Sequence, residues 1–391
     1  MFFTLNEIKS INEEKVNSLK EIGIAEDKHL EYKLTLPSEK YDDKKEFLAD
    51  LSSFANADGG TILYGIKVKD GIPEDIPGLE IDNPDAEILR LENILRTSIE
   101  PRIIGVFFHP FKLSNEKYLI IAHIPRSFNS PHVVNFQGHW KFYSRNSAGK
   151  YPLDVSELKS IISLSATVKE RISNFRLERI SRIKNKEFPF PIVEGPKFIY
   201  HIIPLSSFAS DIPIDLARFE HGQIRYDLFY NLPKIFNYDG ILIHNYEKGY
   251  QADWYTKIFR NGAIEVLTSR LHDSETKLIV RNGFEIELIE NIPKYLSVLN
   301  FFDLTTPLVV FYAVIDIEGY KIRLNEFEHM REWQNRPLNP NDLILPEVML
   351  NDESLENLPF TLKPLFDPIW NAAGHPQSPN FNPKGEWKIK R

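Results

Sequence analysis

The 391-residue sequence contains no cysteine. Disulfide bonds and metal sites built on thiolates are therefore excluded. A reducing, cytoplasmic setting fits this composition, because disulfide-stabilised proteins concentrate in oxidising compartments. Hydrophobic residues make up 42% of the chain and charged residues 26%, which is the balance of an ordinary globular protein with packed cores.

Long apolar runs are also missing. No stretch of about 20 apolar residues occurs, so no membrane span is predicted. The N-terminal segment Met1–Glu7 has neither the basic nor the apolar region of a signal peptide. We therefore expect a protein whose partners do not include a membrane.

Three common catalytic patterns are absent from the sequence. The piece closest to a phosphate-binding Walker motif, Ala148–Tyr151, lacks the first glycine and the metal-binding hydroxyl, so ATP hydrolysis is not predicted. The histidines form neither a His-x3-His nor a His-Glu-x-x-His set, which argues against a histidine metal site. No Gly-x-Ser-x-Gly nucleophile motif occurs.

The charges are unevenly distributed. Residues 1–100 carry a net charge of −10, residues 101–200 carry +9 and residues 201–391 carry −7. A basic middle between acidic flanks is a candidate surface for a polyanion such as nucleic acid. An unevenly charged but merely solvated surface is the alternative, and the charge counts alone leave both open.

Length and patterning predict an α+β protein with two domains. We expect an N-terminal mixed α/β sheet domain over residues 1–165, a basic helical linker over residues 166–195 and a second α/β domain over residues 196–391. The long basic helix between them begins at Asp154, because Asp154 and Glu157 have the spacing of a capping box.

The stretch Glu46–Ile66 predicts a helix that turns directly into a buried strand. Its apolar residues first recur at intervals of three and four, the period of a one-sided helix. The pair Gly59-Gly60 ends the helix, and Thr61–Ile66 is a short run of β-forming residues.

Glu26-x4-Glu31-Tyr32-Lys33 precedes this stretch, and Phe54–Gly60 and Tyr64-Gly65-Ile66 lie within it. Together these motifs resemble the AlbA-like Schlafen domain, a nucleic-acid-associated domain of many bacterial proteins and of the animal Schlafen proteins. The resemblance covers roughly residues 15–165 and implies DNA or RNA as partner, a prokaryotic protein and a possible homodimer. Members are often described as ATP-binding, which the missing Walker motif does not support.

The resemblance directs attention to five residues for nucleic-acid binding: Lys33, Gly59, Gly60, Lys141 and Arg145. Lys33 and Arg145 are the expected phosphate contacts, and the backbone amides of the glycine pair could approach phosphate besides making the turn. Lys141 and Arg145 alternate with Trp140 and Tyr143, whose rings could stack on bases. We expect these two rings to belong to the core.

A metal-dependent nuclease is the first alternative. In animal Schlafen proteins that cut RNA, two glutamates at the spacing of Glu26 and Glu31 and a later aspartate hold a divalent cation. Such oxygen ligands suit Mg²⁺ or Mn²⁺. Here Asp70 is the nearest aspartate, and Lys67 and Lys69 occupy the region where it is expected. The prediction therefore favours binding over cleavage, with Glu26, Glu31 and Asp70 as the metal set if cleavage occurs.

The second alternative is a protein-interaction module that has lost nucleic-acid binding, which the charge of −10 over the first hundred residues favours. The C-terminal domain carries no motif that identifies its function or its partner.

Overall fold

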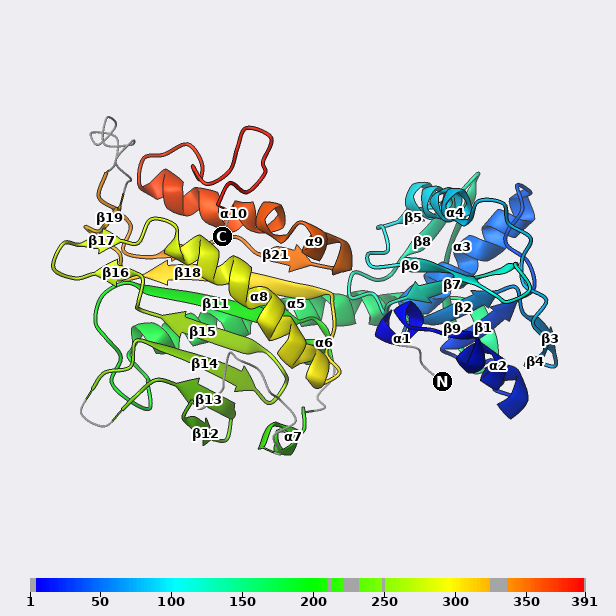
Figure 1. Cartoon of the computed structure of the whole chain (residues 1–391), viewed down its shortest axis with the longest axis horizontal. Helices are drawn as coiled ribbons and strands as arrows, with labels where there is room; N and C mark the ends of the chain where they lie inside the picture. Colours follow the sequence, from blue (N-terminus) through cyan, green and yellow to red (C-terminus); the bar gives the residue numbers. More distant parts are fainter. Residues whose placement is uncertain (1–4, 210–212, 221–231, 248–249, 324–335, 390–391) are drawn as a thin grey trace. The chain divides into compact units, whose positions relative to one another are not determined.

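The computed structural model describes residues 5–209, 213–220, 232–247, 250–323 and 336–389 (Figure 1). They form two compact units, Met1–Thr167 and Val168–Arg391. Both units combine helices with mixed or antiparallel sheets, which confirms the predicted α+β class. None of the described helices has the length and apolarity needed to cross a membrane.

The described residues of the first unit, 5–167, form four complete helices, the beginning of a fifth, and ten strands. The helices are α1 (Leu5–Lys9), α2 (Glu13–Ile22), α3 (Tyr41–Asn56), α4 (Pro84–Ser98) and the start of α5 (Val155–Lys184). The strands are β1 (Leu30–Lys33), β2 (Gly60–Tyr64), β3 (Lys67–Lys69), β4 (Ile72–Asp75), β5 (Ile99–Glu100), β6 (Phe107–Lys112), β7 (Tyr118–Ile124), β8 (Val133–Phe136), β9 (His139–Asn146) and β10 (Gly149–Pro152).

Two four-stranded sheets organise this unit, with strand orders β1-β2-β7-β6 and β10-β9-β8-β5. In the first sheet, Ile62 and Tyr64 of β2 pack with α3 and α4, whereas Leu63 packs with α1 and α2. Helices therefore cover both faces of β2, and all five of its residues are buried. This explains why β2 is a continuous apolar run in the sequence.

The passage from α3 to β2 requires its two glycines. Gly59 has φ +76°, and a Cβ there would lie 2.8 Å from the Ile124 carbonyl oxygen. A Cβ at Gly60 would lie 2.3 and 2.4 Å from ring atoms of Phe54 and 2.6 Å from the His29 carbonyl oxygen. The glycine pair therefore lets α3 pack directly against the start of β2.

The second unit contains the remaining elements. Its helices are the end of α5, then α6 (Ser206–Ala209), α7 (Ala217–Glu220), α8 (Gly283–Phe301), α9 (Asp352–Glu356) and α10 (Leu358–Ala372). Its strands are β11 (Lys197–Pro204), β12 (Lys234–Phe236), β13 (Gly240–His244), β14 (Trp254–Phe259), β15 (Ile264–Thr268), β16 (His272–Asp273), β17 (Leu278–Ile279), β18 (Leu308–Ile315), β19 (Lys321–Ile322), β20 (Leu343–Ile344) and β21 (Val348–Leu350).

An eight-stranded sheet forms the centre of the second unit, with the order β12-β13-β14-β15-β11-β18-β20 and β21 paired to β18. Helices α8 and α10 pack on one face of this sheet (Figure 1). Ile180 and Ile183 of α5 pack on the other face, against Ile199 and Leu267. The predicted capping box is present at the start of α5, where Asp154 and Glu157 exchange hydrogen bonds.

A buried ion pair attaches α5 to this sheet. The Arg179 guanidinium donates to both carboxylate oxygens of Glu265, at 2.8 and 2.9 Å. The Tyr255 hydroxyl donates to the same carboxylate at 2.9 Å, and His201 Nε2 lies 3.0 Å from it. Hydrogen bonds from His201 and Arg179 outweigh the effect of burial and hold the pKa of Glu265 well below its usual range.

Gly60→Ala is expected to destabilise the first unit by about 1–3 kcal/mol, because the added methyl group collides with the Phe54 ring and with backbone. Thermal unfolding and hydrogen exchange over 41–56 measure the effect. Gly138→Ala is the control, since its Cβ would meet nothing within 4 Å and only its left-handed backbone is strained. An equal increase in hydrogen exchange over residues 41–56 in both variants would contradict the prediction.

Glu265→Ala is expected to destabilise the second unit by about 3–5 kcal/mol, because it leaves the Arg179 cation buried without its carboxylate. The double variant Arg179→Met/Glu265→Leu removes both charges and is expected to recover most of that loss. Chemical denaturation of the two variants measures the difference. A double variant no more stable than Glu265→Ala would argue against an unpaired charge as the cause.

Candidate nucleic-acid interface

The alternation of side chains along β1 places two predicted residues on one face of the first sheet. Leu30 and Tyr32 are buried on the side of α1 and α2. Glu31 and Lys33 point the other way, toward α3, because successive side chains of a strand lie on opposite faces. Both make ion pairs there.

Six charged side chains from four elements meet at this place, and we call them the charge network: Glu31, Lys33, Glu46, Asp50, Arg145 and Lys150. Lys33 Nζ lies 2.8 Å from Glu31 Oε1, 3.2 Å from Asp50 Oδ2 and 3.6 Å from Glu46 Oε1. Lys150 Nζ lies 2.6 Å from Asp50 Oδ1 and also pairs with Glu46. Three carboxylates therefore face three cations.

Exposure differs sharply within the charge network. The side chains of Asp50 and Arg145 are 2% and 3% exposed, whereas that of Glu46 is 54% exposed. Lys33 and Lys150 lie between these extremes, at 29% and 21%. Solvent and ligands therefore meet the two lysines and Glu46 first.

Burial and charge set the pKa values of the network. Burial, reinforced by the nearby charge of Glu31, raises the pKa of Asp50 to about 6 despite the two lysines beside it. Burial acts in the same direction on Glu31, but Lys33 and Arg145 outweigh it and lower the pKa of that carboxyl. Burial would lower the pKa of Lys33, but Asp50 and Glu31 raise it well above its usual range, so Lys33 stays charged.

Arg145 acts from inside the domain. Its Nη1 lies 2.9 Å from Glu31 Oε2, and its guanidinium carbon lies 3.5 Å from the centre of the Phe54 ring. A side chain that is only 3% exposed does not present itself to a phosphate at the surface. Arg145 instead fixes the position of Glu31, through an ion pair supported by stacking on the aromatic ring.

The acidic residues predicted for metal binding do not form one ligand set in the described residues. Glu26 Oε1 accepts a hydrogen bond from the Tyr32 backbone N–H at 3.0 Å, and the Glu26 N–H donates to the Gly71 carbonyl. Glu31 is turned toward α3, and Asp70 lies in the turn between β3 and β4. Within the described ranges, no group of three His, Asp or Glu side chains could hold a metal ion. The fold does not bring Glu26, Glu31 and Asp70 together.

The glycine pair is engaged in the fold itself. The Gly59 N–H donates to the Phe54 carbonyl at 2.9 Å and closes the end of α3. Gly60 begins β2 and pairs in register with Ile124 of β7. These contacts give both glycines a structural role: Gly59 makes the tight turn after α3, and Gly60 allows the Phe54 ring to approach the start of β2.

Sequence reasoning missed Glu46, Asp50 and Lys150. Asp50 lies on the buried side of α3, between Phe47 and Phe54, and an acid inside an apolar stripe is a usable signal of a paired charge. Lys150 follows a short turn and pairs in register with Arg145, which the hairpin-like spacing of the two residues could have indicated.

The hairpin of β8 and β9 carries the other predicted residues. Lys141 is exposed on β9. Trp140 is 57% exposed, so the expectation that its ring belongs to the core is wrong. Trp140 lies near the tip of the hairpin, on the opposite face of β9 from Tyr143. Tyr143, further along β9, is half-buried and packs against the core as expected.

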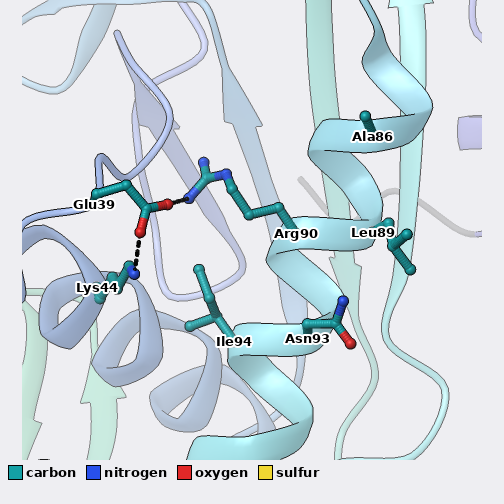
Figure 2. Close-up of a pocket in the computed structure, with 7 residues that line it drawn as sticks. All are labelled: Glu39, Lys44, Ala86, Leu89, Arg90, Asn93 and Ile94. Atoms are coloured by element: carbon teal, nitrogen blue, oxygen red, sulfur yellow. Dashed lines mark hydrogen bonds and ion pairs between the residues drawn. The ribbon is translucent and has the colours of Figure 1, made fainter.

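A surface cavity of about 390 Å³ lies elsewhere on the first unit, between the start of α3 and α4 (Figure 2). Its lining residues are Glu39, Lys44, Ala86, Leu89, Arg90, Asn93 and Ile94. Glu39 pairs with both Lys44 and Arg90, and Arg90 also pairs with Glu87, so both cations of the cavity already have carboxylate partners. None of the predicted site residues lines it.

Asp50→Asn tests the electrostatics of the network through pH. The folded protein holds the Asp50 proton up to about pH 6, whereas the unfolded chain releases it near pH 3.8. The folded state therefore binds more protons in this window, and the contribution of Asp50 to stability falls as pH rises through it. Denaturation of wild type and Asp50→Asn from pH 4 to 7 should show the wild type losing stability relative to the variant. A relative gain would contradict the raised pKa.

Comparison with known proteins agrees with the motifs. Residues 26–154 match the family described as Schlafen, AlbA_2. One similar solved structure is that of the DIP2311 protein from Corynebacterium diphtheriae, with 14% sequence identity and a TM-score of 0.27. The match covers 37% of this chain and 30% of that one, and at this TM-score it supports no inference. No curated protein matches the chain.

The family match extends from Glu26, ahead of β1, to Asp154, where α5 begins, and so contains all six residues of the charge network. Residues 26–154 of this chain match the family that the acidic, glycine and aromatic motifs of the sequence predicted.

Proposed function

We propose that the Schlafen, AlbA_2 domain binds DNA or RNA through the phosphate backbone, over the charge network. At the level of the family, the domain indicates nucleic-acid binding or nuclease-like activity. The observation that carries the proposal is the meeting of Lys33 and Lys150, from two strands, at one partly exposed place beside Glu46. Lys33 was among the residues that the sequence predicted for phosphate contact.

Glu46 is the partner that a phosphate would replace. It is the most exposed carboxylate of the network, and it contacts Lys150 and approaches Lys33 to 3.6 Å. Exposed ion pairs contribute only about 0–1 kcal/mol, so exchanging one carboxylate for a phosphate oxygen costs little. Asp50 and Glu31 would keep the lysines in place during the exchange, because both are largely buried.

Arg145 enters this proposal as a positioning residue, through Glu31 and the Phe54 ring. Lys141, exposed on β9, supplies a further phosphate contact. Contacts of this kind recognise the backbone and carry little sequence information. They also release bound counterions, so affinity should fall steeply as salt rises.

Nuclease activity receives less support from the described residues. Glu31 already faces two cations, and Glu26 is bonded to the backbone of β1. A divalent ion would have to displace Lys33 from Glu31 before it could use that carboxylate. Binding without cleavage is therefore the function that the geometry supports best.

Lys33→Ala and Lys150→Ala should each weaken binding, and each should reduce the slope of log K against log salt by about 0.9 for a lost duplex phosphate contact. Glu46→Gln should strengthen binding, because it frees both lysines of a competing charge. Electrophoretic shift or fluorescence anisotropy at several salt concentrations measures these effects. Lys112→Ala is the matched control, since Lys112 also pairs with an exposed glutamate but lies on β6.

The absence of any shift by wild type at low salt would reject the proposal. A second experiment incubates wild-type protein and Glu31→Ala with the same labelled DNA and RNA in Mn²⁺ and measures cleavage. Cleavage that disappears in Glu31→Ala would replace binding by nuclease activity as the function of the domain.

A further inference from the structure

Four rings and two lysines surround the tip of the β8–β9 hairpin, beside the first turns of α3, with a fifth ring on the other face of the hairpin. We call this surface the hairpin patch, and its residues are Tyr41, Lys45, Phe136, His139, Trp140, Lys141 and Tyr143. Phe136 and Tyr143 pack partly against the core of the domain, but Tyr41 is 37% exposed and Trp140 is 57% exposed.

The rings are arranged in stacked pairs. Tyr41 and Phe136 stack with their centroids 5.5 Å apart, and His139 and Tyr143 stack at 5.9 Å. His139 Nε2 also lies 2.8 Å from the Tyr143 hydroxyl. These contacts hold the rings in fixed orientations. Binding a planar ligand would therefore cost little side-chain mobility in the protein.

The hairpin presents rings on both of its faces. His139, Lys141 and Tyr143 alternate with Trp140 along β9 and therefore lie on the opposite face from it. Gln137 and Gly138, both with positive φ, form the tight turn between the strands. The strand ends thus project the rings from a rigid two-stranded support.

Two cations accompany the rings. Lys45 Nζ lies 5.2 Å from the centre of the Tyr41 ring, and its ion pair with Asp42 is exposed and exchangeable. Lys141 lies two residues from His139 on β9 and therefore on the same face. Burial, together with the charges of Lys141 and Lys45, lowers the pKa of His139. Rings interleaved with lysines are the pattern of surfaces that bind single-stranded nucleic acid.

We propose that the hairpin patch stacks the unpaired bases of a single-stranded nucleic acid whose backbone lies on the charge network. This inference rests on the proposed function and adds the class of ligand. A duplex keeps the faces of its bases stacked inside, so it can use the lysines but not the rings. Lys45 of the hairpin patch and Glu46 of the charge network are consecutive residues of α3, so the two surfaces adjoin. A single nucleic-acid strand can therefore contact both.

The test compares a labelled single strand with the duplex of the same sequence, as DNA and as RNA. Wild type should bind the single strand more tightly. Trp140→Ala and Tyr41→Ala should each weaken single-strand binding by about 5- to 150-fold, the range for one stacked base, and leave duplex binding unchanged. Trp140→Phe, which keeps a ring, should retain most of the affinity. Tyr238→Ala is the control, because that ring is 91% exposed in the second unit.

The outcomes separate this inference from the proposed function. If wild type binds neither form, the proposed function fails. If wild type binds both forms and the ring variants lose affinity for both equally, or for neither, backbone binding stands and the stacking surface is rejected. Sedimentation velocity of wild type and Trp140→Ala tests whether a second copy of this chain covers the patch. A self-associated wild type that becomes monomeric in the variant would overturn the inference.

Discussion

The close approach of Phe54 to the backbone of Gly60 is the contact on which the first unit depends. No side chain fits between them, so α3 lies directly on the start of β2. That position puts the Phe54 ring under the Arg145 guanidinium, and Arg145 in turn holds Glu31. A steric constraint in the core therefore sets the geometry of a charged surface. A substitution at Gly60 would alter the charge network indirectly, through Phe54 and Arg145.

The local elements of the first unit were predictable because short-range rules govern them. The helix, the glycine pair and the buried strand follow from periodicity and turn chemistry, and Lys33 and Arg145 follow from a motif. Their partners were not predictable, because Lys150 meets Asp50 across 100 residues of sequence. Alternation along β9 puts Trp140 and Tyr143 on opposite faces of the strand. The sequence alone does not show which of the two faces the rest of the domain covers.

Composition overstated the basic character of α5. The net charge of +9 over residues 101–200 includes arginines that the second unit uses internally. Arg179 is buried against Glu265, and Arg176 donates to the Leu345 carbonyl and lies over the Phe311 ring. Counting charges along a sequence cannot separate cations that hold a helix in place from cations available to a ligand, because burial and pairing are properties of the fold.

The balance of charge in the network affects which anions can enter it. Glu46 is attached to the same helix as Asp50, so after displacement it stays nearby at a high effective concentration and competes to return. If the network binds nucleic acid as proposed, a free phosphate or a single nucleotide would meet this competitor with one contact, whereas a polymer would present its next phosphate each time one contact opens. The tethered carboxylate would then favour a polyanion over the abundant small phosphates.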